Sequence, residues 1–269
     1  MRNKIIILFI LVSFMVSSIS WARRPPPPKL DPIHDVSLKG DVEEIKKILR
    51  ETPEMLRHTS IEGLTPFHYA AVGGHITAVG FFLSKEIDIN EGEKSILSIV
   101  IERSRGEYCK KMVNFLLKNG ANVNTGGLSP LAAAVDRNNI DVAEILLLNR
   151  TNINAKLDDS GTTALHLAAS KDYLIDMLRF LILNGANINS VNSMSGSPLC
   201  EAAKWGNIES VELLLQHSAN KNIRNRDGKT SLALAEEQLE KVIKHGGNTP
   251  NSIEKANNYR KIISLLQDN

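Results

Sequence analysis

Aromatic side chains are scarce in this 269-residue chain, with seven Phe, four Tyr and two Trp making up 5% of it. A large core must therefore consist mainly of Ala, Leu, Ile and Val, which pack well between closely spaced helices. This favours repeated helical hairpins over a large sheet enzyme. The hydrophobic content of 42% and the charged content of 23% are typical of folded domains and exclude a disordered chain or a multispan membrane protein.

Excess charge is also lacking. The first 22 residues contain two of the 32 basic residues, Arg2 and Lys4, and none of the 30 acidic ones, so the rest of the chain is balanced. Nucleic-acid-binding domains usually carry a basic excess on one face. The charge balance therefore argues against a nucleic-acid partner.

Motifs of common enzymes are absent: the sequence contains no nucleophile elbow, Walker A loop, HExxH or CxxC pair. Glu102, Glu107 and His245 are the titratable residues closest to an active-site set, and their spacing matches no known arrangement. We therefore expect no enzyme, no cofactor and no metal site, with a catalytic site in an irregular part of the chain as the weaker alternative.

The N-terminus has the three parts of a secretory signal. Arg2 and Lys4 precede an apolar run at 5–16, and the small residues Ser20 and Ala22 suit signal peptidase, so 1–22 is predicted to be a signal peptide. The alternative is an uncleaved anchor, but the apolar stretch is shorter than the roughly 20 residues of a spanning helix. Export to the periplasm or outside the cell is expected, with membrane association only if the signal stays uncleaved.

Residues 23–30 form a proline-rich linker, Arg-Arg followed by four prolines, Lys and Leu. Consecutive prolines fix φ and favour an extended polyproline II conformation. This segment is predicted to be a stiff spacer before the folded body.

A repeat of about 33 residues covers the chain after Leu30. Thr65-Pro66-Phe67-His68-Tyr69-Ala70-Ala71 recurs from Ser129, Thr163, Ser197 and Thr230, with weaker copies from Asp31 and Ser95. A second pattern of Asn-Gly-Ala-Asn-Val-Asn type, such as 119–124 and 184–189, keeps the same period. Two motifs in phase at one period predict a repeat architecture.

These motifs resemble the ankyrin repeat, which implies an all-α solenoid of stacked helix-turn-helix units joined by β-hairpin-like loops. Thr or Ser at the start of the first helix would cap it, and Pro in the next position suits the first turn. Gly120 and Gly185 would end the second helix, whereas Asn149-Arg150 and His217-Ser218 should make more strained turns. The ankyrin-repeat domain is expected at 31–269, in units 31–60, 61–90, 91–124, 125–157, 158–192, 193–226 and 227–269.

The same resemblance explains the residues that could suggest chemistry. His68 and His166 take the position where histidine in this family hydrogen-bonds between neighbouring repeats, which is preferred over metal ligation because ligands at zinc spacing are missing. Cys109 and Cys200 lie almost three units apart, too far for a disulfide, and are expected to be free thiols.

Function is expected to be non-catalytic binding of an unidentified protein in the concave groove, by a monomer. The family's variable positions, at the loop tips and the ends of the first helices, predict binding residues Ile61, Glu62, Val72, Asp136, Arg137, Asp159, Lys171, Met194, Lys204, Trp205, Arg226 and Lys229. Trp205 is the strongest candidate because exposed Trp is typical of binding hot spots. The alternative is that this ring lies flat on its own repeat.

Two units are irregular. The third is longer than the others between Ser95 and Gly120, and its polar segment 103–109 is expected to bulge from the groove-side turn. Its Arg103, Arg105 and Tyr108 are either a second specificity element or a tolerated surface insertion. In the last unit a helix is expected to reach Lys244, followed by a closing helix at 252–266. Frequent Ile, Asn and Lys suggest a bacterial source, with delivery to a host cell or an envelope scaffold as further options.

Overall fold

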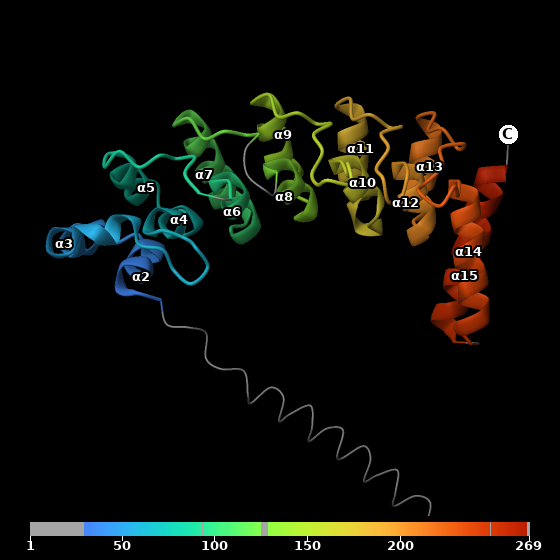
Figure 1. Ribbon diagram of the computed structural model, residues 1–269, viewed down its shortest axis with the longest axis horizontal. Coiled ribbons are helices and arrows are strands. Elements are labelled where there is room, and N and C mark those ends of the chain that lie inside the picture. The colour runs from blue at the N-terminus through green and yellow to red at the C-terminus, as the bar shows by residue number, and fades with distance from the viewer. Residues whose placement is uncertain (1–29, 93, 125–128, 248, 268–269) are drawn as a thin grey trace, which may run out of the picture.

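Seven pairs of antiparallel helices form a curved stack in the computed structural model, which describes residues 30–92, 94–124, 129–247 and 249–267 (Figure 1). Each pair falls within one of the seven predicted units. The pairs are α2 (Pro32–Lys39) and α3 (Val42–Glu51), α4 (Pro66–Val72) and α5 (Ile76–Leu83), α6 (Ile96–Arg103) and α7 (Gly106–Lys118), α8 (Pro130–Asp136) and α9 (Ile140–Leu148), α10 (Ala164–Ala169) and α11 (Ile175–Leu183), α12 (Pro198–Trp205) and α13 (Ile208–Gln216), and α14 (Ser231–His245) and α15 (Pro250–Gln267).

In each pair before α14 and α15, the first helix lies on the inside of the arch and the second on the outside (Figure 1). Two short 3-10 helices, η1 (Pro53–Arg57) and η2 (Asp172–Leu174), complete the helical elements of the described residues. The described residues contain no strand, only an isolated bridge between Asn192 and Gly196. The predicted all-α solenoid is therefore confirmed.

Local sequence explains where the inner helices begin. Pro occupies the first turn of α2, α4, α8 and α12, where its missing N–H is not needed. The side chains of Ser197 and Thr230 accept hydrogen bonds from the amides of Cys200 and Ala233, both at 3.3 Å. These caps satisfy N–H groups that the helix itself leaves free.

One continuous apolar core runs through the stack. The Ala pairs of four inner helices are at most 1% exposed, namely 70–71, 133–134, 168–169 and 202–203. Because Ala has a short side chain, it lets neighbouring inner helices approach closely. The core of each unit is thus completed by the units on either side, which explains why stability depends on stacking.

The turns after the outer helices differ in backbone strain, as predicted, according to whether a glycine is present. Gly120 and Gly185 adopt φ of 90° and 86°, a region that glycine enters freely. Arg150 and Ser218 adopt φ of 65° and 64° at the equivalent turns, where a Cβ makes this conformation unfavourable. The prediction of strained turns at these two sites is confirmed.

The expected bulge in the third unit is wrong. Ser104 and Arg105 alone separate α6 from α7, and the additional residues lengthen α7 to 13 residues, against 8 or 9 in α5, α9, α11 and α13. The Ser104 hydroxyl donates to the Val72 carbonyl at 2.9 Å, and Cys109 is fully buried. Extending the helix satisfies backbone groups that a loop would leave to solvent.

The last unit ends the stack with two long helices. α14 continues to His245, as expected, and α15 packs against both α14 and α13. Ile262 and Leu266 are buried in this contact, while Ile263 and Leu265 are only partly buried. The predicted signal peptide 1–22 and all of the predicted linker 23–30 except Leu30 lie outside the described residues. Within the described part, no helix combines the length and apolar character needed to cross a membrane.

Candidate functional site

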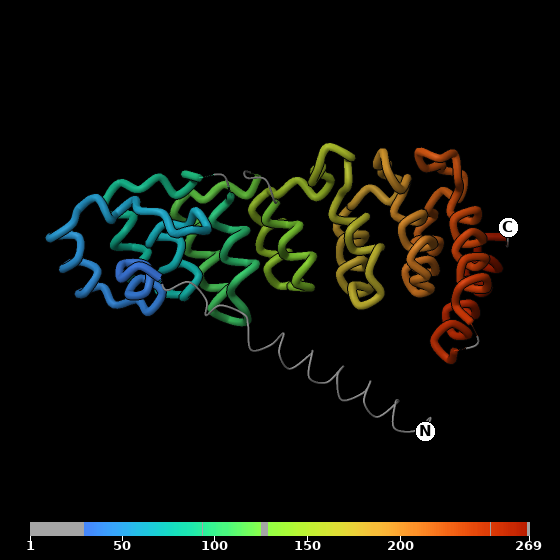
Figure 2. Tube along the Cα trace, turned by 60° about the horizontal axis from the view of Figure 1, so that its bottom comes forward, coloured from blue at the N-terminus to red at the C-terminus, as the bar shows by residue number. Residues whose placement is uncertain are grey.

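Two rows of loops run along opposite long edges of the stack (Figure 2). We call the loops that lead from an outer helix to the next inner helix fingers, and the turns between the two helices of a unit the turn row. The finger loops contain Ile61, Glu62, Asp159, Met194, Arg226 and Lys229 of the predicted set. The ends of the inner helices and the turn row contain Val72, Arg103, Arg105, Tyr108, Asp136, Arg137, Lys171, Lys204 and Trp205. The prediction thus describes two separate surfaces rather than one groove lining.

The first described finger folds over the inner helices. The Ser60 hydroxyl accepts from the amides of Glu62 and Leu64, both at 3.3 Å, which shapes the loop. Leu64 is 5% exposed and packs with Tyr69 and Ile99, and the Glu62 carboxylate pairs with Arg103 at 2.7 Å. The concave side of the first three units is therefore filled by the chain's own side chains, and Val72 offers only part of its surface.

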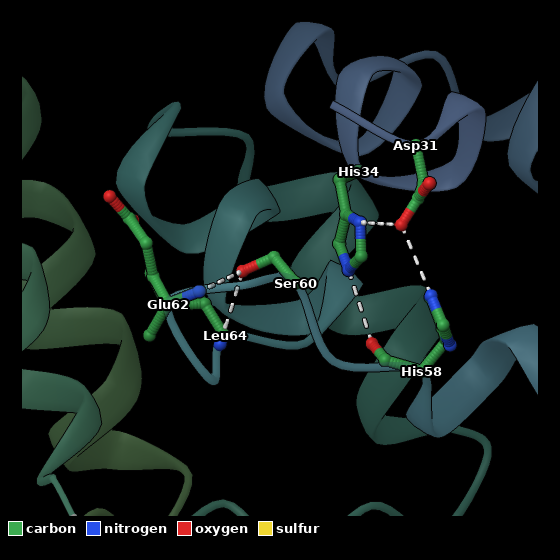
Figure 3. Close-up of polar contacts among 6 residues, drawn as sticks. All are labelled: Asp31, His34, His58, Ser60, Glu62 and Leu64. Atoms are coloured by element: carbon green, nitrogen blue, oxygen red, sulfur yellow. Dashed lines mark hydrogen bonds and ion pairs between the residues drawn. The ribbon is translucent and has the colours of Figure 1, made fainter. Parts of the chain in front are cut away.

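A cluster of Asp31, His34 and His58 fastens this finger to the first inner helix (Figure 3). The Asp31 carboxylate lies 3.1 Å from His58 Nε2 and 3.6 Å from His34 Nδ1. His34 Nε2 lies 3.1 Å from the carbonyl oxygen of His58, so this nitrogen donates. Because His34 is fully buried, the contact fixes the start of the stack. Sequence analysis did not single out this cluster, although Asp31 and His34 have the i, i+3 spacing of one helical turn.

An open cleft between the third and fourth units is lined by Arg105, Asp136 and Arg137. Lys110 lies at its edge and pairs with Glu107 at 3.0 Å and Asp141 at 3.1 Å. Asp136 pairs with Lys171 of the next unit. Most charges in this cleft are therefore neutralised within the chain.

Tyr108 projects from the start of α7 beside this cleft and is 74% exposed. It is not among the residues that line the cleft.

Trp205 is 58% exposed at the end of α12, where the repeat pattern predicts an exposed residue. Its Nε1–H donates to the Glu201 carboxylate at 3.0 Å, and Lys204 Nζ lies 5.5 Å from the ring centroid. The Glu201 carboxylate thus holds the indole at its Nε1 edge, and the Lys204 ammonium lies over the ring. The ring lines an open pocket of about 490 Å³ together with Tyr173 and residues of α13 and α15.

Tyr173 is the functional candidate that sequence analysis missed. It is 58% exposed in the turn of the fifth unit and faces the same pocket as Trp205. A signal was available, because the turn from Ala169 to Ile175 is one residue longer than the equivalent turn from Ala203 to Ile208. The additional residue is accommodated by η2, and Leu174 is buried while Tyr173 is exposed.

The far wall of this pocket is supplied by the last helix. Tyr259 of α15 donates its hydroxyl to the Lys204 carbonyl at 3.0 Å and packs against Gly206. Gly206 adopts φ of 80°, and a Cβ there would lie 3.2 Å from the tyrosine ring. The absence of a side chain at 206 thus allows the closing helix to dock against the turn row.

Comparison with known proteins defines the family. The family model described as ankyrin repeats (3 copies) matches residues 33–126, 104–192 and 165–245, which is most of the chain. The chain belongs to the ankyrin-repeat family. The human ASB11 ankyrin repeat domain is similar in structure, with a TM-score of 0.68 and 23% identity over 89% of this chain and 99% of that domain.

Relatives in sequence include a Danio rerio protein named as palmitoyltransferase ZDHHC13, 28% identical over 77% of this chain and 32% of the relative. The fowlpox virus ankyrin repeat protein FPV031 is 32% identical over 63% of this chain and 46% of the relative. The chain therefore spans less than half the length of these relatives. Ankyrin repeats generally bind protein partners, and their fold is typically non-enzymatic.

The finger row of this ankyrin-repeat stack offers smaller apolar features. Met194 is 67% exposed and its neighbour Val191 is 55% exposed, in the finger that precedes α12. Ile61 is 82% exposed on the first described finger. Asp159 and Arg226 are exposed at other fingers, whereas Lys229 is held by Glu237 at 2.8 Å. These side chains lie on the opposite edge from the Trp205 pocket.

Both repeat-motif histidines have structural partners. His166 Nδ1 accepts from the Thr163 amide at 3.2 Å, and its Nε2 donates to the Gly196 carbonyl of the next ankyrin repeat at 3.0 Å, as expected. His68 likewise accepts from the Thr65 amide at 3.2 Å within its own unit. Burial lowers the pKa of His68 to about 4 and lowers that of His166. Both imidazoles are thus neutral parts of the ankyrin scaffold.

The cysteines are free, as expected, and both are buried. Burial raises the pKa of the Cys109 thiol, which disfavours the reactive thiolate. Among the described residues, no group of three His, Cys, Asp or Glu side chains could hold a metal ion.

Proposed function

We propose that this chain is a non-catalytic ankyrin-repeat module that binds a protein through its turn row, with the Trp205 pocket at the centre of the contact. The observation that supports this most strongly is that Trp205 and Tyr173, each 58% exposed, line one pocket. Burying large aromatic rings contributes much of the energy of many protein interfaces. The polar turn-row residues of the predicted set, Asp136, Arg137, Lys171 and Lys204, would form a rim beside it.

The distribution of charge supports a protein partner over a nucleic acid. Outside residues 1–22 the chain carries 30 basic and 30 acidic residues, so no general attraction for phosphate is expected. Around Trp205 the lysine Lys204 and the acids Glu201 and Glu209 alternate in sign. Mixed charges around an apolar centre suit the polar rim of a protein interface.

We further propose that the module is exported, which rests on the signal-like residues 1–22 alone. N-terminal sequencing of the protein from a bacterial expression host would give Arg23 as the first residue if the signal is removed. Met1 as the first residue in a membrane fraction would instead support a tethered scaffold.

The binding proposal is tested with Trp205→Ala. Because Trp205 is exposed at the end of its helix, we expect the melting curve to change little. Capture of protein partners from periplasm and host lysate should lose the bands that the wild type retains. Leu148→Ala is the matched control, since Leu148 is 77% exposed at the end of an outer helix, outside the turn row. Equal retention of partners by the wild type, Trp205→Ala and Leu148→Ala would refute the proposal, as would collapse of the fold in Trp205→Ala.

A further inference from the structure

The Trp205 pocket has the features of a site for a proline-rich peptide. Tyr173 and Trp205 come from the turns of two successive units, are each 58% exposed, and both line the same pocket. Aromatic pairs of this kind bind polyproline II segments, because proline rings pack on flat aromatic faces and the ligand is already extended before binding. A peptide ligand that binds as a helix or a strand would use neither the packing of proline rings nor the extended conformation before binding.

Charges at the pocket favour a basic ligand. Asp172 and Glu209 line it and are exposed, and neither forms an ion pair within the described residues, whereas Lys255 is the one ammonium group in the lining. The two carboxylates outnumber the one ammonium group of the lining. Two further ammonium groups lie beside it: Lys204 Nζ is 5.5 Å from the Trp205 ring centroid, and Lys171 Nζ, which pairs with Asp136, is 5.9 Å from that of Tyr173. A proline-rich peptide flanked by Arg or Lys would therefore be attracted to it.

The chain itself contains a segment with this chemistry. Residues 23–29 consist of two arginines, four prolines and a lysine. The segment ends next to Leu30, at the α2 end of the stack, while the pocket lies at α12 near the other end (Figure 1). Five layers of packed helices separate these ends by about 40–50 Å. The residues from Arg23 to Leu30 span at most about 25 Å, so a chain cannot place this segment in its own pocket.

We propose that the Tyr173–Trp205 pocket binds the proline-rich segment 23–29 of a second copy of this chain. The inference rests on the proposed role of this pocket as a binding surface. Because the segment and the pocket lie at opposite ends, the contact is head-to-tail, and repeated contacts would form open chains rather than closed pairs. The monomer expected from the sequence then exists only at low concentration.

Trp205 provides a direct probe, since it is the only tryptophan in residues 23–269. That fragment retains every described residue of the folded body. The emission of Trp205 should change and saturate when a synthetic peptide of residues 23–30 is added to the 30–269 protein, which lacks the segment. Tyr173→Ala should lower the affinity for this peptide by at least about tenfold, as expected for loss of an aromatic anchor.

Matched controls isolate each feature of the contact. Tyr108→Ala removes an aromatic residue of similar exposure outside the pocket and should leave peptide affinity unchanged. A peptide with four alanines in place of the prolines, or with Arg23→Glu and Arg24→Glu, should bind several-fold more weakly. Equal affinity for these peptides, or an unchanged affinity in Tyr173→Ala with an unchanged melting curve, would overturn the proposal.

Sedimentation of the 23–269 and 30–269 proteins tests whether the segment binds a second copy of the chain. The 23–269 protein should form larger species as its concentration rises, and the 30–269 protein should remain monomeric. Identical sedimentation would overturn head-to-tail association. Partner capture that still depends on Trp205 would then show that the pocket binds proteins but not this segment, so failure of this inference is distinguishable from failure of the proposed function.

Discussion

Asn154 and Asn187 connect two neighbouring ankyrin repeats directly, because the Asn154 side-chain oxygen accepts the backbone N–H of Asn187 at 2.8 Å. The same contact recurs at three other unit boundaries. Within each of the third to sixth units a second hydrogen bond joins asparagines two residues apart. The resulting series runs through Asn90, Asn122, Asn124, Asn152, Asn154, Asn187, Asn189, Asn220 and Asn222.

Replacing Asn154 by Ala should lower the free energy of unfolding by about 1 kcal/mol, the usual net value of such a hydrogen bond. Asn154→Asp retains an acceptor at the same position and should stay close to the wild type. Urea denaturation of the three proteins measures the difference. Equal stability of the Ala variant and the wild type would show that this contact between units contributes nothing.

The buried histidines predict a loss of stability in acid. Burial lowers the pKa of His68 to about 4, whereas an unfolded histidine has a pKa of about 6.5. Between these values the unfolded chain binds a proton that the folded His68 does not. The contribution of His68 to the free energy of unfolding is therefore complete above pH 6.5. It is lost as the pH falls towards 4, by about 1.4 kcal/mol per pH unit.

His68→Gln tests this linkage, because a glutamine oxygen can also accept from the Thr65 amide while it does not titrate. Its free energy of unfolding should depend less steeply on pH between 6.5 and 4 than that of the wild type. His217→Gln alters an exposed histidine and serves as the control. A slope as steep in His68→Gln as in the wild type would contradict the assignment.

Regular local chemistry made most of the ankyrin scaffold predictable. Pro130 and the Ala pair after it indicate an inner helix, and Gly120 marks the end of an outer one, because each residue suits one backbone conformation or one packing distance. The exposure of Trp205 also followed from its place in the repeat. Such inferences depend on a few neighbouring residues and on the period.

Features that depend on contacts between units could not be predicted in the same way. The Glu62–Arg103 pair joins residues 41 apart across the concave side. The pocket beside Trp205 is lined in part by Lys255 and Asn258 of the last helix, which the Tyr259 hydroxyl joins to the Lys204 carbonyl. The third unit shows a further limit, since a polar segment with Gly106 suggested a loop although it begins a helix.

Relief of the strained turn at Ser218 should stabilise the protein. Ser218 adopts φ of 64°, whereas Gly185 takes the equivalent position in the preceding unit with φ of 86°. Ser218→Gly should raise the free energy of unfolding by about 0.5 kcal/mol, because the left-handed penalty exceeds the additional freedom of glycine in the unfolded chain. Thermal or urea denaturation measures the gain, and a lower stability of this variant would contradict the strain argument.

Gly206 offers a test of the closing helix, with Gly120 as its matched control. Both glycines have positive φ, 80° and 90°, so alanine at either site meets the same backbone penalty of about 1 kcal/mol. Only at 206 would the added Cβ meet a neighbour, the Tyr259 ring at 3.2 Å, whereas nothing lies within 4 Å at 120. Gly206→Ala should therefore be less stable than Gly120→Ala by a further 1 kcal/mol or so, since crowding in a packed contact is unfavourable.

Gly206→Ala should also alter the fluorescence emission of Trp205 in the 23–269 protein, because displacement of Tyr259 changes the pocket wall. Equal loss of stability in the two variants, with unchanged emission, would show that Tyr259 does not dock α15 against the turn row.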